Sequence, residues 1–188
     1  MNSSLRTQFS TVGVIALLGA LAAVAVMSLA GCSGSTSSGI TDSSPGTKPG
    51  SSESMLLQVR AAGQVGNELD VQPLRDAQVE DLRTMAMQAE NRRDFAAAQR
   101  ALSQALLITP DDPDLLQWQA ELALVTRKWV QAEQLAMRSY DKGPKLGGLC
   151  RRNWTTILFA SQARGDVAAA AQAQQRVAAC TVAPPTRM

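Results

Sequence analysis

The sequence predicts an all-α protein in which a helical hairpin is repeated about three times. Residues of like size recur at steps of 34 positions: Leu82 and Leu116, Ala86 and Ala120, Ala89 and Ala123, Phe95 and Trp129, Ala98 and Ala132, Pro110 and Pro144. A fixed period in the range of about 20–50 residues indicates stacked supersecondary units. Prolines stop helices, and the recurring alanines let two antiparallel helices approach closely. The pattern therefore predicts a solenoid of paired helices.

Residues 1–31 carry the parts of an export signal. One positive charge, Arg6, precedes an apolar run from Val12 to Ala30, and small residues close the segment. The run of about 19 uncharged residues is also just long enough to span a membrane. An uncleaved anchor helix is therefore the alternative to a cleaved leader.

Leu29-Ala30-Gly31-Cys32 ends this segment and resembles the lipobox of bacterial lipoproteins. The resemblance implies cleavage before Cys32 and acylation of that cysteine with fatty chains such as palmitate. Each buried methylene of such a chain adds about 0.8 kcal/mol to membrane binding. Ser33, rather than an aspartate, follows the cysteine. By the same resemblance we expect a lipid anchor in the outer membrane, with the protein facing the periplasm.

Two short segments separate the lipobox from the repeats. Residues 32–54 consist mostly of Ser, Gly and Thr, a composition that cannot bury enough apolar surface to fold, so we predict a flexible linker. We predict an N-terminal capping segment at 55–76, in which Met55–Val59 is apolar enough for a short helix or an added segment. Leu69, Val71 and Leu74 would then lie against the first repeat.

The repeats resemble tetratricopeptide (TPR) repeats, whose sequence runs W-x2-L-G-x2-Y, then A-x3-F, then P. The first repeat gives Leu82-x2-Met85-Ala86-x2-Ala89, followed by Ala98-x3-Leu102 and Pro110. The resemblance implies a TPR domain over 77–180, with repeats at about 79–112, 113–146 and 151–183 and a tail at 181–188. Gln119, Leu158 and Gln174 depart from the pattern. An ordinary helical bundle is the alternative.

Cys150 and Cys180 remain once Cys32 is assigned to lipid. They lie at the start and at the end of the third predicted hairpin, and antiparallel helices bring those ends together. Exported compartments are oxidising. We therefore predict a Cys150–Cys180 disulfide, with two buried thiols as the alternative.

The residues for most catalytic chemistry are missing from the sequence. The chain has no histidine, and neither a zinc-protease, a serine-hydrolase nor a phosphate-binding motif occurs. Asp111, Asp112 and Asp114 suit a helix start better than a calcium loop. We expect no enzyme activity, no metal, no cofactor beyond the lipid on Cys32 and no small-molecule substrate. With 18 basic and 16 acidic side chains, the chain has no concentrated positive charge for nucleic acid.

TPR stacks usually bind peptides or helices on the concave face, which the first helix of each repeat lines. The resemblance assigns thirteen residues to this face: Glu80, Arg83, Met87, Glu90, Asn91, Asp114, Gln117, Glu121, Leu124, Arg152, Thr155, Phe159 and Gln162. Met87, Leu124 and Phe159 would form an apolar strip that suits an amphipathic segment. In the alternative interpretation, some of these residues only pack between repeats.

We expect a membrane-anchored, non-enzymatic adaptor that binds a protein partner in the cell envelope. By its general plan the chain is similar to the TPR lipoproteins that support type IV or Tad pilus and secretion systems. The alternative is a regulator or recruiter of a peptidoglycan-remodelling enzyme or of an outer-membrane assembly complex. Fold alone does not decide between these functions.

Overall fold

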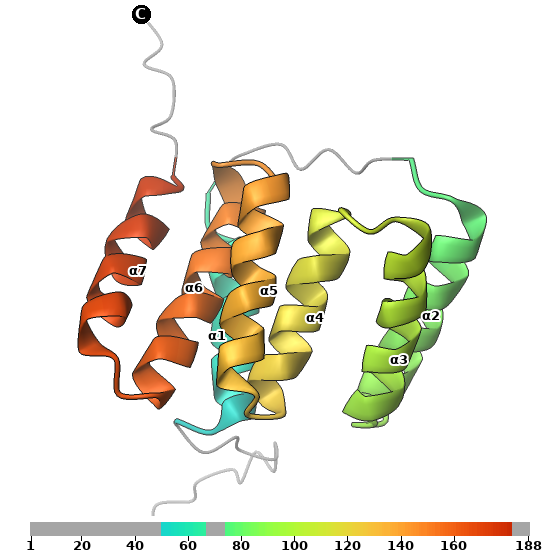
Figure 1. Cartoon of the computed structure of the whole chain (residues 1–188), viewed down its shortest axis with the longest axis horizontal. Coiled ribbons are helices and arrows are strands. Elements are labelled where there is room, and N and C mark those ends of the chain that lie inside the picture. Colours follow the sequence, from blue (N-terminus) through green and yellow to red (C-terminus); the bar gives the residue numbers. More distant parts are fainter. Residues whose placement is uncertain (1–49, 67–73, 182–188) are drawn as a thin grey trace, which may run out of the picture. The chain divides into compact units, whose positions relative to one another are not determined.

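The structure, a computed structural model, describes residues 50–66 and 74–181. These residues form seven helices and no strand (Figure 1), so the all-α prediction is confirmed. The helices are α1 (Ser52–Gly63), α2 (Ala77–Asn91), α3 (Phe95–Ile108), α4 (Pro113–Val125), α5 (Trp129–Lys142), α6 (Gly147–Ala163) and α7 (Val167–Ala179). The predicted leader, Cys32 and linker residues 33–49 lie outside the described residues. None of the described helices combines the length and the apolar character that crossing a membrane requires.

Six of these helices form three consecutive pairs. The pairs are α2 with α3, α4 with α5 and α6 with α7, and each pair packs on the next through α3–α4 and α5–α6 contacts. In Figure 1, α2, α4 and α6 belong to one layer and α3, α5 and α7 to the other. This is the stacked arrangement that the 34-residue period predicts.

The third pair begins earlier than the sequence suggests, at Gly147 rather than near Arg151. The backbone N–H of Gly147 donates to the carbonyl oxygen of Cys180 at 2.7 Å. This bond satisfies one of the N–H groups that the first turn of a helix leaves unpaired. The end of α7 therefore supports an extra turn at the start of α6.

Aspartates start four of the helices. Asp76, Asp94, Asp112 and Asp166 precede α2, α3, α4 and α7, and each side chain accepts a backbone N–H from the first turn. Asp112 receives two, from Asp114 and Leu115, and Pro113 occupies the first helical position. The prediction that Asp112 and Pro113 start a helix is confirmed.

The turn inside each pair requires one residue with positive φ. Arg93 and Arg127, 34 positions apart, have φ values of 61° and 60°, and Gly165 has 76° at the third turn. Residues with a Cβ rarely adopt this conformation, whereas glycine does so readily. Of the three turns, the third therefore has the residue best suited to this backbone conformation, Gly165.

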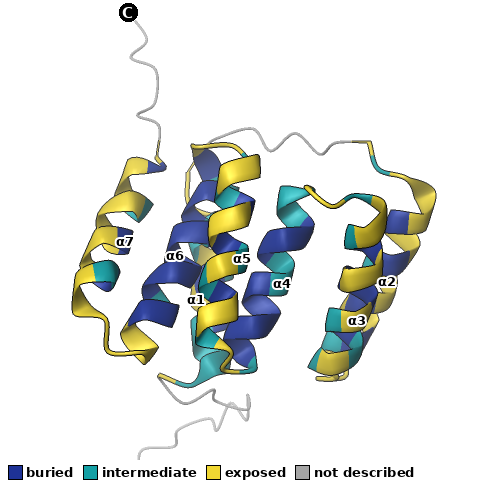
Figure 2. Cartoon of the chain, in the orientation of Figure 1, coloured by how far each residue is buried: buried dark blue, intermediate teal, exposed yellow. Residues whose placement is uncertain are grey.

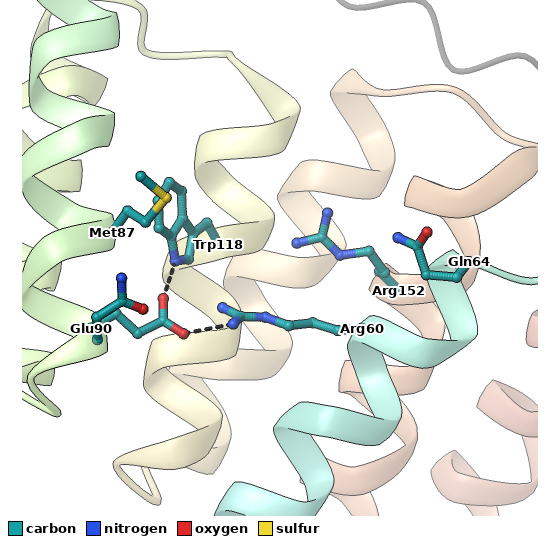
Figure 3. Close-up of a pocket in the computed structure, with 7 residues that line it drawn as sticks. Arg60, Gln64, Met87, Glu90, Trp118 and Arg152 are labelled. Atoms are coloured by element: carbon teal, nitrogen blue, oxygen red, sulfur yellow. Dashed lines mark hydrogen bonds and ion pairs between the residues drawn. The ribbon is translucent and has the colours of Figure 1, made fainter.

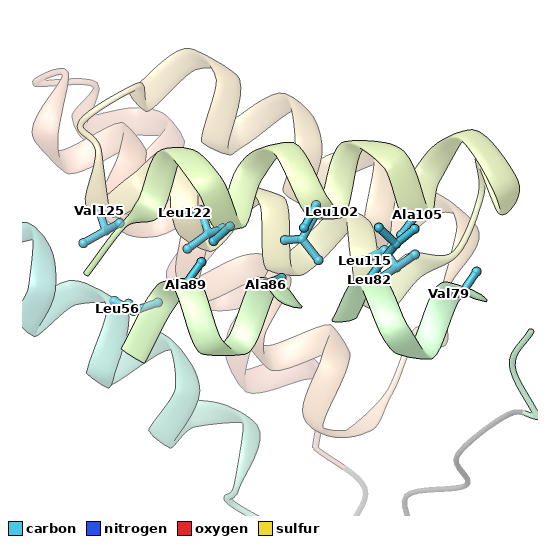
Figure 4. Packing of buried hydrophobic residues seen from close by; sticks show 12 residues of the cluster. Leu56, Val79, Leu82, Ala86, Ala89, Leu102, Ala105, Leu115, Leu122 and Val125 are labelled. Carbon is cyan, nitrogen blue, oxygen red and sulfur yellow. The ribbon is translucent and has the colours of Figure 1, made fainter. Parts of the chain in front are cut away.

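Small residues hold the two layers together. Ala86 and Ala120 in the first helices, and Ala98 and Ala132 in the second helices, are fully buried. Figure 2 shows the buried residues where the helices meet, and Figure 4 shows Leu82, Leu102 and Leu115 packed around such alanines. Close approach at alanines lets the larger side chains fill the rest of the core.

The N-terminal helix differs most from prediction. α1 begins at Ser52, capped by Ser51, so the last three residues of the predicted linker are helical. It packs on α6 and α4 rather than capping the first repeat. Leu74 is fully exposed instead of lying against that repeat, and Leu69 and Val71 lie outside the described residues. The backbone of α1 does not come close to α3, α5 or α7. The helix lies on the side of α2, α4 and α6.

Candidate functional site

The first helices of the three pairs line the face where partner binding was expected, and α1 occupies part of it. Val59 has no exposed surface and shares a buried cluster with Leu124, Ala160 and the half-buried Phe159. Leu56, one helical turn earlier, belongs to the cluster around Ala86 and Leu122 of the first two pairs (Figure 4). The chain thus covers part of its own concave face.

Two glycines allow α1 to approach α6. A Cβ placed on Gly148 would lie 2.5 Å from the carbonyl oxygen of Gly63, and a Cβ on Gly63 would lie 2.7 Å from Cδ of Arg152. Arg151 Nε donates to the carbonyl oxygen of Ala62 at 3.0 Å, and a second N–H of Arg151 reaches the carbonyl of Val65. A cation at the C-terminal end of α1 also suits the helix dipole.

Glu121 lies at the centre of the polar contacts beneath α1. Its side chain is fully buried. Arg152 Nε donates to Oε1 at 2.8 Å, Gln117 Nε2 donates to the same oxygen at 3.1 Å, and Arg60 Nε donates to Oε2 at 3.0 Å. The carboxylate therefore ties α1 to both α4 and α6.

Arg60 also reaches the first pair, where its guanidinium lies 2.6 Å from Glu90. Burial by itself would lower the pKa of Arg60, but the hydrogen bonds and negative charges of Glu90 and Glu121 outweigh it and raise that pKa above its ordinary value. The second oxygen of Glu90 accepts the indole N–H of Trp118 at 2.8 Å. Arg60 thus stays protonated and holds two carboxylates.

A pocket of about 340 Å³ remains on the part of the concave face that α1 leaves open (Figure 3). Helices α1, α2, α4 and α6 all contribute to it: its lining is Arg60, Gln64, Met87, Glu90, Asn91, Trp118 and Arg152. Arg83 stacks over the Trp118 ring, 5.5 Å from its centroid. This pocket is the candidate site.

The structure brings together only some of the thirteen predicted residues. Met87, Glu90, Asn91 and Arg152 line the pocket, and Arg83 flanks it through Trp118. Glu80 and Asp114 instead pair with the buried Arg75, at 3.8 and 2.5 Å. Gln162 lines a separate hollow between α6 and α7.

The predicted apolar strip of Met87, Leu124 and Phe159 is wrong. Leu124 is fully buried and Phe159 half-buried in the cluster that contains Val59 of α1, so Met87 alone is available at the surface. Gln117, Glu121 and Thr155 are also buried, which excludes direct contact with a partner while α1 is in place. These residues were expected at the surface because the N-terminal segment was predicted to cap the first repeat, whereas α1 packs on α4 and α6.

Three residues of the pocket were not predicted: Arg60, Gln64 and Trp118. Arg60 comes from α1, and Gln64 directly follows that helix. Leu56 and Val59 are spaced as one apolar helix face, and Arg60 follows directly, which is a signal for a docked amphipathic helix. The sequence gives no indication of which face such a helix covers.

A disulfide joins the two helices of the third pair. Cys150 and Cys180 are bonded, with Cα atoms 5.7 Å apart, in agreement with the predicted pairing. Among the described residues, no group of three or more His, Cys, Asp or Glu side chains is arranged to hold a metal ion.

Among the comparisons with known proteins, a solved structure is informative. No family model and no curated protein matches the chain. The solved structure of the globular C-terminal domain of P. aeruginosa LpoP is similar: it is 30% identical, with a TM-score of 0.52. The match covers 56% of this chain and 99% of that domain.

The chain belongs to the family of the LpoP C-terminal domain. The LpoP domain is helical and TPR-like, which agrees with the paired helices described above. Because the LpoP match spans 56% of this chain, the remaining residues have no counterpart in it.

Proposed function

We propose that this chain is a lipid-anchored envelope protein that regulates a peptidoglycan-building enzyme through direct protein contact. The observation that carries the proposal is the likeness to the LpoP domain over nearly its whole length. That likeness supports the regulator expected as the alternative from sequence. The comparisons give no support to pilus assembly, which is therefore the weaker of the two functions.

The side chains that line the candidate site favour a binding protein over an enzyme. The charged side chains of the candidate site form ion pairs with one another: Arg60 with Glu90 and Glu121, and Arg152 with Glu121. Histidine is absent from the sequence, so the commonest general base is not available. The surface instead offers an aromatic ring, a methionine and arginines, which are typical of protein-binding sites.

Anchoring in the outer membrane through Cys32 is part of the proposal. The lipobox resemblance supports it, as does the Ser/Gly/Thr-rich composition between Cys32 and α1. That segment of roughly 19 residues reaches at most about 65 Å when fully extended. A chain held in this way would meet envelope enzymes without leaving the membrane.

The test is deletion and complementation in the organism that encodes the chain. We expect deletion to lower the incorporation of a labelled peptidoglycan precursor into the cell wall. Complementation with wild type should restore incorporation, whereas the Cys32→Ala variant should fail to take up radiolabelled palmitate and should restore little. Normal precursor incorporation together with a loss of exported pilin would contradict the proposal and favour pilus assembly.

A further inference from the structure

The pocket on the concave face has one apolar wall. Met87 is 51% exposed, and Trp118 faces the same space. The indole N–H of Trp118 is bound to Glu90 and Arg83 covers one face of the ring, so the orientation of the ring is fixed. A fixed ring beside a flexible thioether suits a large apolar side chain of a ligand.

The carboxylates in and beneath this pocket, Glu90 and Glu121, are already engaged. Both oxygens of Glu90 have partners, Arg60 and the Trp118 indole. Both oxygens of Glu121 also have partners, Arg152 and Gln117 on one and Arg60 on the other. A ligand that brings further N–H donors would therefore find no unoccupied carboxylate there.

Donors remain in excess. A guanidinium has five N–H groups, and the contacts of Arg60 and Arg152 use only some of them. One terminal nitrogen of Arg83 is shielded from solvent and has no hydrogen-bond partner, although Nε of the same residue lies 3.5 Å from Glu80. The three arginines together carry more N–H groups than they donate to Glu80, Glu90 and Glu121, which favours a ligand with a negatively charged acceptor.

The size of the pocket limits what can enter. A volume of about 340 Å³ is at the small end of the range for ligand pockets, about 300–1,000 Å³. A partner helix cannot pack on Leu124 and Phe159, because α1 already covers them. One or two side chains of an extended segment do fit.

We propose that the pocket between α1, α2, α4 and α6 binds a segment of a partner protein in which a carboxylate lies next to a large apolar side chain. The apolar side chain packs between Met87 and Trp118, and the carboxylate accepts N–H groups from the surrounding arginines. The site is incomplete without α1, which supplies Arg60. This inference rests on the proposed function, because it describes how a protein partner is recognised.

The experiment is selection from a random heptapeptide display library on the full-length protein purified in detergent. Four proteins are compared: wild type, Met87→Glu, Met87→Lys and Met85→Glu. The two Met87 substitutions differ only in the sign of the new charge. Met85 is the matched control, because it lies on the same helix with a similar exposure of 56% but does not line the pocket.

We expect wild type to select peptides that carry Asp or Glu beside a large apolar residue. Synthetic versions of these peptides should bind Met87→Glu at least tenfold more weakly, because the new carboxylate repels the ligand. They should bind Met87→Lys and Met85→Glu with an affinity close to that for wild type. The indole N–H resonance of Trp118, assigned with Trp118→Phe, should shift on binding.

Three results would overturn the inference. The selected peptides could lack acidic residues, or Met87→Glu and Met87→Lys could bind them equally. Purified cell-wall muropeptides could also shift the Trp118 resonance and displace the peptides, in which case the ligand is the cell wall and not a protein. If deletion leaves peptidoglycan synthesis normal while the selected peptides are acidic, the proposed function is refuted and the inference about the pocket stands.

Discussion

At the residue scale, Glu121 decides how the concave face is organised. A buried carboxylate is tolerated only when charged or polar donors surround it, and Glu121 receives N–H groups from three helices. Two of these donors are arginines, Arg60 of α1 and Arg152 of α6. The TPR pattern assigns Glu121 to ligand binding, but in this structure it connects α1, α4 and α6 instead.

We expect Glu121→Gln to lower the free energy of unfolding by about 2–4 kcal/mol, because it leaves Arg60 and Arg152 without their shared anion in a buried site. Urea unfolding followed by circular dichroism measures the change. Asp111→Asn is the control. Hydrogen bonds from Lys142 and Arg138 lower the pKa of Asp111, but this carboxylate is fully exposed, so its replacement should hardly affect stability. Equal losses in both variants would contradict the role of Glu121.

At the scale of elements, α1 is attached by few residues. Its buried apolar side chains are Leu56 and Val59, and the polar contacts of Arg60 and the approach at Gly63 complete the interface. A helix of 12 residues is marginal in isolation, so its stability depends on this interface.

We expect Val59→Asp to release α1 from the groove, because the new carboxylate would be buried among Leu124, Ala160 and Phe159. Hydrogen–deuterium exchange should then show loss of protection at α1 amides, while α4 and α5 stay protected. Leu57→Asp is the matched control, since Leu57 is 59% exposed on the same helix. Unchanged protection of α1 in Val59→Asp would show that the helix is held by other contacts.

The paired helices could be predicted from the sequence, whereas the position of α1 could not. The repeats follow from local rules: alanines at close contacts, aspartates at helix starts and a period of 34 residues. The disulfide follows from the antiparallel pairing of α6 and α7. α1 docks through tertiary contacts with α4 and α6, and no sequence period relates it to them.

The candidate site was predicted in part for the same reason. Met87, Glu90, Asn91 and Arg152 were assigned correctly to one surface because the repeat register places them there. Arg60 and Gln64 were absent from the prediction because they belong to α1 and to the residue directly after it. Leu124 and Phe159 were assigned to the surface because, without α1, the register leaves them uncovered.

At the scale of the whole molecule, α1 changes what a partner meets. A TPR groove usually offers a long concave face, but here α1 packs on α4 and α6 and covers part of that face. What remains is a small pocket with an apolar wall and an excess of donors. The same helix is the first element that the structure describes, and it supplies Arg60 to the candidate site.

Reconstitution tests the central claim most directly. A purified bifunctional peptidoglycan synthase of the same organism is mixed with its lipid-linked precursor, and the rate of glycan polymerisation is measured with wild type, Met85→Glu or Met87→Glu. We predict that wild type and Met85→Glu raise the rate and that Met87→Glu does not. An unchanged rate with wild type, for every synthase of the organism, would contradict the account.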